Sequence, residues 1–114
     1  MFRIKRVYEP PSPEDGFRIL VDRLWPRGLS KDSAHIDLWL KDIAPSDRLR
    51  KWFSHDPKKW PEFKRRFSKE LEKSSDAVAT LKTLAKQKKA ITLVYGAKDE
   101  EHNNAVFLLE FLRV

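Results

Sequence analysis

The chain has 114 residues, of which 40% are apolar, and it carries a net charge of +7 at neutral pH. This length supports one ordinary domain, residues 1–114, and is too short for a second hydrophobic core. Because the chain has no cysteine, disulfides, thiol nucleophiles and cysteine-ligated zinc are excluded. The first six residues lack the apolar stretch of a signal peptide or membrane span, so we expect a soluble, cytoplasmic protein without membrane contact.

The chain begins with a pattern of two strands joined by a short connector. Residues 2–7 alternate in polarity and residues 17–21 form an apolar run, so both predict strands. Between them, Ser12 can cap a single helical turn that Pro13 begins and Gly16 ends. Because this connector is short for a parallel crossover, it favours a hairpin, with a one-turn crossover as the alternative.

The next segment is ambiguous, and a capped helix follows it. Residues 36–43 match helical spacing through one set of apolar positions and one face of a strand through another. Ser46 is then a suitable cap for a short helix that buries Leu49, Trp52 and Phe53. Ser30, Ser46 and Ser54 all read as turn or cap residues.

Two consecutive helices occupy the middle of the chain. Asp56 and Pro57 predict a helix start, and the aromatic and aliphatic residues of its buried face continue to Leu71. Ser75 or Asp76 opens the next helix, whose buried stripe is Val78, Leu81, Leu84 and Ala85.

The last elements are a strand and a helix. Residues 90–95 are almost continuously apolar or β-branched, which predicts a central strand buried on both faces. A final helix is expected from about Glu100, with Asp99 as its N-cap, and its inner positions are Ala105, Leu108, Leu109 and Leu112.

Strands that alternate with helices predict a single layered α/β domain with a small, mostly parallel sheet flanked by helices. Ligands of such sheets gather beyond the carboxyl ends of the strands. That edge would hold residues 22–28, after the second strand, and residues 96–104, after the last. If both strands run parallel, these two loops share one edge.

Three segments carry a resemblance to a known family: residues 21–28 (VDRLWPRG), 39–46 (WLKDIAPS) and 49–60 (LRKWFSHDPKKW). In this order they resemble the YeaO-like branch of domain-of-unknown-function family 488, over nearly the whole chain. The resemblance implies a parallel sheet and a strand within residues 36–43, but no established reaction. Longer relatives carry a Cys-x-His-Arg-like segment after the last strand. This chain lacks the cysteine and arginine, and His102 keeps the position of the histidine.

Charged and aromatic side chains follow the second strand. Arg23 and Arg27 can bind the oxygens of a carboxylate or phosphate, and Trp25 can stack on a ring. In the structural alternative, Asp22 forms an ion pair with Arg23 or Arg27, and Trp25 is a packing lid. We predict that Asp22 is catalytic and that the other three bind a ligand.

The remaining candidates are His55 and the loop after the last strand. His55 and His102 titrate near neutral pH and are predicted as catalytic acids or bases. Tyr95, Lys98 and Asn103 are predicted to bind the ligand, because backbone N–H groups at a helix start attract anions. The three histidines are isolated in sequence and glycine-rich nucleotide motifs are absent, so no metal or cofactor is predicted.

The resulting hypothesis is a small enzyme or binding protein for an anionic ligand, such as a nucleotide or another phosphorylated metabolite. The alternative is a nucleic-acid-binding module, because residues 58–89 contain eleven Lys and Arg against four acids, which is the whole net charge. Pairs such as Glu62 with Arg66 and Arg66 with Glu70 also suit a solvated helix. A third interpretation is a partner-binding subunit or homodimer that uses the four tryptophans; the oligomeric state stays open.

Overall fold

The computed structural model describes residues 2–113. Its single sheet has four parallel strands in the order β1-β4-β2-β3, which are Phe2–Arg6, Ile91–Tyr95, Phe17–Leu20 and Leu38–Trp39. The helices are α1 (Lys31–Ala34), α2 (Asp47–Phe53), α3 (Trp60–Lys73), α4 (Ser75–Gln87) and α5 (Asn104–Leu112). The predicted layered α/β domain is therefore confirmed.

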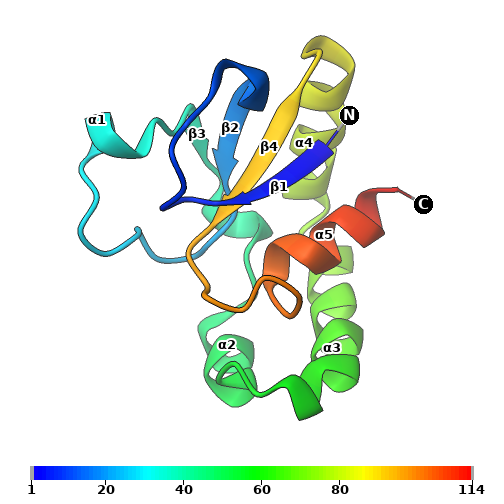
Figure 1. Ribbon diagram of the computed structural model, residues 1–114. Helices are drawn as coiled ribbons and strands as arrows, with labels where there is room; N and C mark the ends of the chain where they lie inside the picture. Colours follow the sequence, from blue (N-terminus) through cyan, green and yellow to red (C-terminus); the bar gives the residue numbers. More distant parts are fainter. Residues whose placement is uncertain (1, 114) are drawn as a thin grey trace.

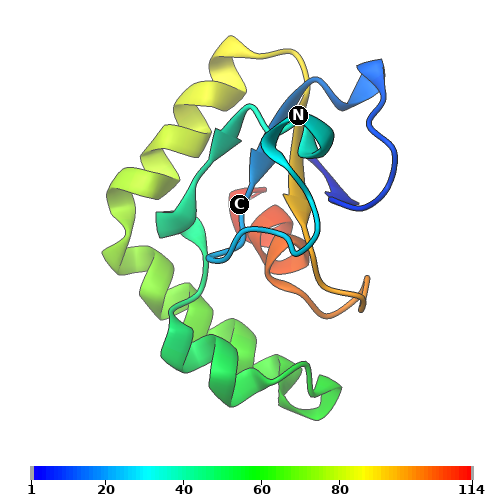
Figure 2. The same cartoon turned by 90° about the vertical axis from the view of Figure 1, so that its left-hand side faces the viewer.

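The two faces of the sheet are covered differently. Helices α3, α4 and α5 lie on one side of the sheet and the small α1 lies on the other (Figure 1). The alternation of the strands explains this division, because Ile19 and Leu93 join the large core while Leu20 and Val94 face the small one. Seen from the side, α2, α3 and α4 form an arc around the edge of the domain (Figure 2).

Strand β4 is central, as predicted, and all five of its residues are buried. Thr92, the second residue of the strand, donates a hydrogen bond of 2.7 Å from its hydroxyl to the backbone carbonyl of Asp15. A polar side chain can therefore stay in the middle of the sheet without an unsatisfied hydroxyl.

The favoured hairpin between the first two strands is wrong, and the one-turn crossover is correct. Strands β1 and β2 do not pair with each other, because β4 lies between them and runs parallel to both. The crossover contains the short 3-10 helix η1 (Pro13–Asp15), with the capping interaction between Ser12 and Asp15 that the sequence suggests. Polar side chains lie between this connector and the sheet, and the hairpin prediction did not include them.

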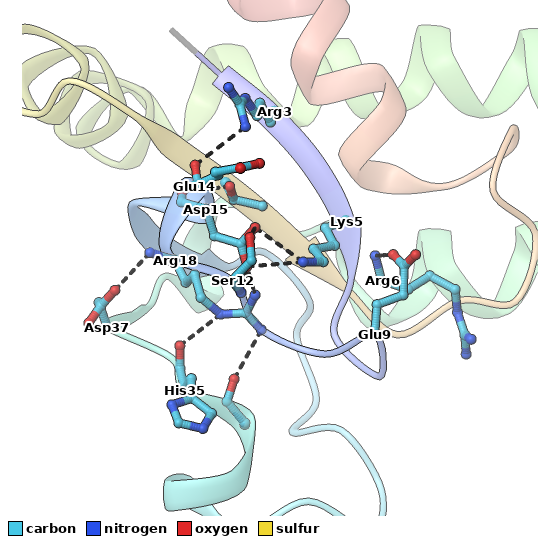
Figure 3. A network of polar contacts seen from close by, with 12 residues as sticks. Arg3, Lys5, Arg6, Glu9, Ser12, Glu14, Asp15, Arg18, His35 and Asp37 are labelled. Atoms are coloured by element: carbon cyan, nitrogen blue, oxygen red, sulfur yellow. Dashed lines mark hydrogen bonds and ion pairs between the residues drawn. The ribbon is translucent and has the colours of Figure 1, made fainter.

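The carboxylate of Asp15 is the centre of that polar interior (Figure 3). It accepts a 2.6 Å hydrogen bond from Arg18 on β2 and two of 3.2 Å from Lys5 on β1. Arg18 is buried and also donates to the carbonyls of Ala34 and His35 at the end of α1. Burial raises the pKa of Asp15, but the Ser12 N–H, Lys5 and Arg18 outweigh it and leave the pKa below its usual value.

Three further expectations need correction. Residues 36–43 contain the two-residue strand β3 followed by a 3-10 helix (Lys41–Ile43), so neither single assignment is complete. Helix α5 begins at Asn104 rather than near Glu100. Its core contacts include Phe107 and Phe111, whereas Leu109 is absent from the packed core.

The polar ends of the helices largely follow the sequence. Ser30 and Ser46 cap α1 and α2, and Ser54 ends α2 in a left-handed conformation. The pair of Glu62 with Arg66 is present, but Glu70 accepts hydrogen bonds from the backbone and hydroxyl of Ser46 instead of pairing with Arg66. Glu70 therefore joins α3 to the start of α2.

We expect Gly16→Ala to destabilise the protein by at least about 3 kcal/mol, because Gly16 has a φ of +66° and an added Cβ would lie 2.4 Å from the carbonyl oxygen of Ala90. The matched control is Gly28→Ala, where φ is +82° but the space is open, and we expect a cost of about 1 kcal/mol. Urea unfolding measures both. If both variants lose the same free energy of unfolding, Gly16 does not pack closely against Ala90, the residue before β4.

We expect Asp15→Asn to cost about 3 kcal/mol at pH 7, because it removes one partner of a buried ion pair. A lowered pKa contributes stability that is present above the unfolded value, near pH 4, and is lost as the pH falls through the folded value. The difference between wild type and variant should therefore shrink below about pH 4. The control is the neighbouring, exposed Glu14→Gln, and a loss of similar size there would refute the role of Asp15.

Candidate functional site

A cavity of about 460 Å³ lies at the carboxyl ends of β2 and β4, where the sequence placed the candidate site. It is formed by the loop after β2, the loop after β4 and the ends of α2 and α3. Its lining contains the predicted Asp22, Arg23, Trp25, Arg27, His55, His102 and Asn103, together with Tyr8, Leu24, Pro26, Pro45, Arg50, Phe53, Phe63, Gly96, Ala97 and Asn104.

Asp22 joins the two loops. One carboxylate oxygen accepts a 2.8 Å hydrogen bond from the Gly96 N–H, and the other accepts one of 3.1 Å from the Asn104 amide. Asn104 also donates to the carbonyl of Val21. The loops after the second and last strands therefore share one edge, as predicted. Burial raises the pKa of Asp22 above its ordinary value, against the hydrogen bonds and the charges of His55 and Arg50.

The two predicted arginines are not held by Asp22. Arg23 donates from Nε to the Pro45 carbonyl at 3.0 Å and from Nη2 to the Ala44 carbonyl at 3.2 Å. Arg27 is exposed, and its carbonyl accepts a hydrogen bond from the Tyr8 hydroxyl. The internal ion pair considered from the sequence is absent among residues 2–113, and both arginines belong to the cavity lining.

Trp25 is a packing lid, as one of the two interpretations of the sequence has it, and it also lines the cavity. Its indole N–H donates to the Leu29 carbonyl at 2.7 Å, and its ring packs edge to face on Trp39 at 5.3 Å. These contacts fix the ring as part of the cover on the small core. Since Trp25 also lines the cavity, its orientation is set before any ligand arrives.

The two predicted histidines reach the cavity from different segments. His55 is exposed and, like Ser54 before it, has a positive φ, so this turn takes a sharp path that few residues other than glycine adopt. His102 is more enclosed: its Nδ1 lies 3.0 Å from Oδ2 of Asp99 and its ring packs on the edge of Trp60. The Glu101 N–H, and then His102, hold the pKa of Asp99 below its ordinary value despite some burial.

Asn103, not Asp99, is the N-cap of α5. Its side-chain oxygen accepts from the Val106 N–H, and its amide donates to the Asp99 carbonyl. Asp99 instead caps the preceding turn through the N–H groups of Glu101 and His102. Asn103 lines the cavity but is only 3% exposed. Its side-chain oxygen and amide already form hydrogen bonds at the start of α5.

Tyr95 and Lys98 are outside the cavity lining. Tyr95 is buried under the sheet edge, and this burial raises the pKa of its phenol. Lys98 is exposed on the loop after β4.

Several lining residues escaped the sequence reasoning. Phe53 and Phe63 were assigned to the core, and they serve both roles. Arg50 was not among the predicted site residues, yet it lines the cavity, and its Nε is buried without a hydrogen-bond partner among residues 2–113. Asn104 stands next to a predicted residue, but its contact with Asp22 depends on the sheet order, which no local pattern encodes.

The described part of the chain contains neither a metal-binding cluster nor a membrane-spanning helix. Within residues 2–113, histidine and acidic side chains do not gather in groups of three or more that could hold a metal ion. Over the same residues, every helix is too short or too polar to cross a membrane.

This geometry defines a class of protein: a small parallel α/β domain with a cationic cavity at the carboxyl edge of its sheet. Residues 1–114 match the family model described as the inactive DUF488-N3 subclade, so the chain belongs to the DUF488 family, in its YeaO-like branch. This confirms the family that the three sequence segments suggested.

Curated relatives from two groups of bacteria are similar to the chain over almost its whole length. The uncharacterized protein YeaO of Escherichia coli is 42% identical over 109 residues, which cover 96% of this chain and 94% of the relative. An uncharacterized protein of Mycobacterium tuberculosis is 40% identical over 110 residues, covering 96% and 92%. No solved structure matches the chain.

We expect Asp22→Asn and Asp15→Asn to have opposite pH dependence. Because the folded pKa of Asp22 is raised, its contribution to stability is greatest below the unfolded pKa, near 4, and is lost as the pH rises through the folded value. Relative to Asp22→Asn, the wild type should therefore lose stability between about pH 4 and pH 7. Urea unfolding across this range is the measurement, and a difference that grows with pH would contradict a buried, partly desolvated carboxylate.

Proposed function

We propose that this protein binds a small anionic, phosphorylated ligand in the cavity at the carboxyl edge of its sheet. The observation that carries this proposal is the gathering of three arginines, Arg23, Arg27 and Arg50, and two histidines in a lining whose one acidic residue, among residues 2–113, is Asp22. The volume of about 460 Å³ lies within the usual range for small-molecule sites.

The charge balance of the cavity supports an anion. Among residues 2–113, Asp22 is the only acidic residue in the lining, and both of its oxygens accept hydrogen bonds from Gly96 and Asn104. Neither Arg23 nor Arg27 forms an ion pair with it. Arg23 is held in place by two backbone carbonyls, so an oxyanion can meet a guanidinium group whose orientation is already fixed.

The remaining walls support a ligand that also has an apolar part. Trp25, Phe53 and Phe63 line the cavity together with Leu24, which is 58% exposed. A flat ring could stack on the indole of Trp25, whose orientation is fixed by the Leu29 carbonyl. A nucleotide combines such a ring with a phosphate, so it is our first candidate ligand.

We favour binding without turnover. The description of the matching family as inactive agrees with the missing cysteine and arginine after β4. In this proposal His55 and His102 contact the ligand rather than transfer a proton. The contact of His102 Nδ1 with Asp99 suits that task, because it orients the ring and leaves Nε2 to a ligand oxygen.

The basic helices of residues 58–89 stay a prediction for nucleic-acid binding. Part of their charge is used internally, since Arg65 and Arg66 pair with Glu62 and Lys64 lies 3.8 Å from Glu110. Arg66 also covers the ring of Trp52. These contacts are those of a solvated helix surface.

Isothermal titration calorimetry with AMP, inorganic phosphate and a short RNA, at low and moderate salt, tests the function. We expect AMP to bind the wild type, and Arg27→Met to lose about tenfold in affinity, because one charged contact contributes on the order of 1.5 kcal/mol. Arg23→Met should lose at least as much, but it also removes two internal hydrogen bonds, so its melting temperature must be checked.

The matched control is Arg48→Met. Arg48 is an exposed arginine of α2 outside the cavity, and its loss removes the same charge from the protein. We expect its affinity for AMP to equal that of the wild type. If Arg27→Met and Arg23→Met both bind as tightly as Arg48→Met, the cavity is not the site. If only RNA binds, and its affinity falls with added salt but does not change in Arg27→Met, the function belongs to residues 58–89.

A further inference from the structure

Tyr8 gives the cavity an aromatic surface that the fold leaves exposed. It lies two residues after the end of β1, so a third loop at the carboxyl edge of the sheet contributes to the cavity. Tyr8 is 42% exposed, whereas Phe53 and Phe63 in the same lining are buried. Trp25 is half-buried and belongs to the cover on the small core. Among these rings, Tyr8 therefore offers the largest exposed fraction to a molecule in the cavity.

Two contacts fix the orientation of the Tyr8 ring. Its hydroxyl donates a 2.9 Å hydrogen bond to the Arg27 carbonyl. The guanidinium carbon of Arg6 lies over the ring, 5.1 Å from its centre. Arg6 itself donates from Nε and Nη2 to the carbonyls of Ala97 and Gly96. The ring is thus attached to the loops after β2 and β4, and it does not have to reorient to meet a ligand.

Gly96 leaves space beside this ring. A Cβ placed on Gly96 would lie 3.9 Å from Cε2 of Tyr8 and 3.2 Å from Oδ2 of Asp22. The φ of Gly96 is not positive, so its backbone conformation does not itself require glycine. All three residues line the cavity. The missing side chain therefore keeps the cavity open next to both the phenol ring and the carboxylate.

We propose that Tyr8 recognises the ring of the ligand, which stacks on the free surface of the phenol beside Gly96. This inference rests on the proposed function and narrows the ligand to a phosphorylated compound with a flat aromatic ring, such as a nucleoside monophosphate. Arg27 connects the two parts of the site, because its carbonyl holds the Tyr8 hydroxyl and the residue belongs to the same lining. Stacking of this kind tolerates different bases, since each has a flat aromatic face.

A purely structural Tyr8 makes a different prediction. If it only joins the loop after β1 to Arg27 through its hydroxyl, Tyr8→Phe removes that role as completely as Tyr8→Ala does. Both variants would then weaken every ligand of the cavity to the same extent. If the phenol stacks on the ligand, Tyr8→Phe keeps the stacking surface and Tyr8→Ala loses it. The loss is then confined to ligands that carry an aromatic ring.

The experiment is isothermal titration calorimetry of the full-length protein with AMP and with ribose 5-phosphate, which keeps the sugar and phosphate but lacks the base. The measured quantity is the ratio of the two affinities. We expect the wild type to bind AMP on the order of tenfold more tightly, because one base stacked on an aromatic side chain contributes about that factor. Tyr8→Ala should bring the ratio close to one, and Tyr8→Phe should leave it within about threefold of the wild type.

The chain also offers an internal control for the position of the base. It has two tyrosines, Tyr8 and Tyr95, and Tyr95 is buried and lies outside the cavity lining. Protein labelled with ¹³C in its tyrosine rings therefore gives two sets of NMR signals, and those of Tyr8 are the ones missing from Tyr8→Phe. We expect AMP to shift the Tyr8 signals in a saturable way, ribose 5-phosphate to shift them far less, and Tyr95 to respond little to either.

The outcomes separate this inference from the proposed function. If both ligands bind but folded Tyr8→Ala keeps the preference for AMP, or if AMP leaves the Tyr8 signals unchanged, the role of Tyr8 is refuted while the cavity remains an anion site. The same holds if Tyr8→Phe and Tyr8→Ala weaken both ligands equally, or if the wild type binds AMP and ribose 5-phosphate equally well. If neither ligand binds the wild type, both proposals fail. Melting temperatures show whether each variant folds, and the NMR titration decides if Tyr8→Ala does not.

Discussion

The buried ion pair between Asp15 and Arg18 is the constraint on which the rest of the fold depends. Ten residues separate β1 from β2, and they must cross β4 to bring the two strands to its opposite sides. The carboxylate of Asp15 accepts hydrogen bonds from Lys5 on β1 and Arg18 on β2. Its backbone carbonyl accepts one from Thr92 on β4. Buried ion pairs contribute little net stability compared with apolar packing. We infer that this one specifies the strand order instead.

Charged side chains have different hydrogen-bond partners at the two ends of the sheet. At the amino end, Arg18 directs Nε, Nη1 and Nη2 to His35, Asp15 and Ala34, so its donors are used within the fold. At the carboxyl end, Arg23 uses Nε and Nη2 within the fold, whereas Arg27 is exposed and forms no ion pair with Asp22. A charge that is satisfied internally stabilises a structure, and one that is not can recognise a ligand. This contrast supports the proposed ligand site at the carboxyl edge.

The sequence predicted what depends on local chemistry. The caps at Ser12 and Ser46 and the buried β4 follow from short patterns, and the shared edge of the two loops was expected only if the strands run parallel. Features that depend on residues far apart in the sequence could not be predicted. The hairpin was favoured because nothing local shows that β4 inserts between β1 and β2. The helix start was placed too early because Asp99 and Asn103 are both good cap residues, and only the contacts of the folded chain choose between them. Arg50, which also lines the cavity, was not among the predicted site residues.

Asp22 links the fold to the chemistry of the cavity. By accepting hydrogen bonds from Gly96 and Asn104 it holds together the two loops that shape the site, and by its burial it carries a carboxylate with a raised pKa beside the arginines. An anion bound next to it would disfavour its ionised form further and raise that pKa again. Protonation of Asp22 and binding of an anion therefore favour each other. A residue selected to position two loops would thus also make the affinity of the site depend on pH.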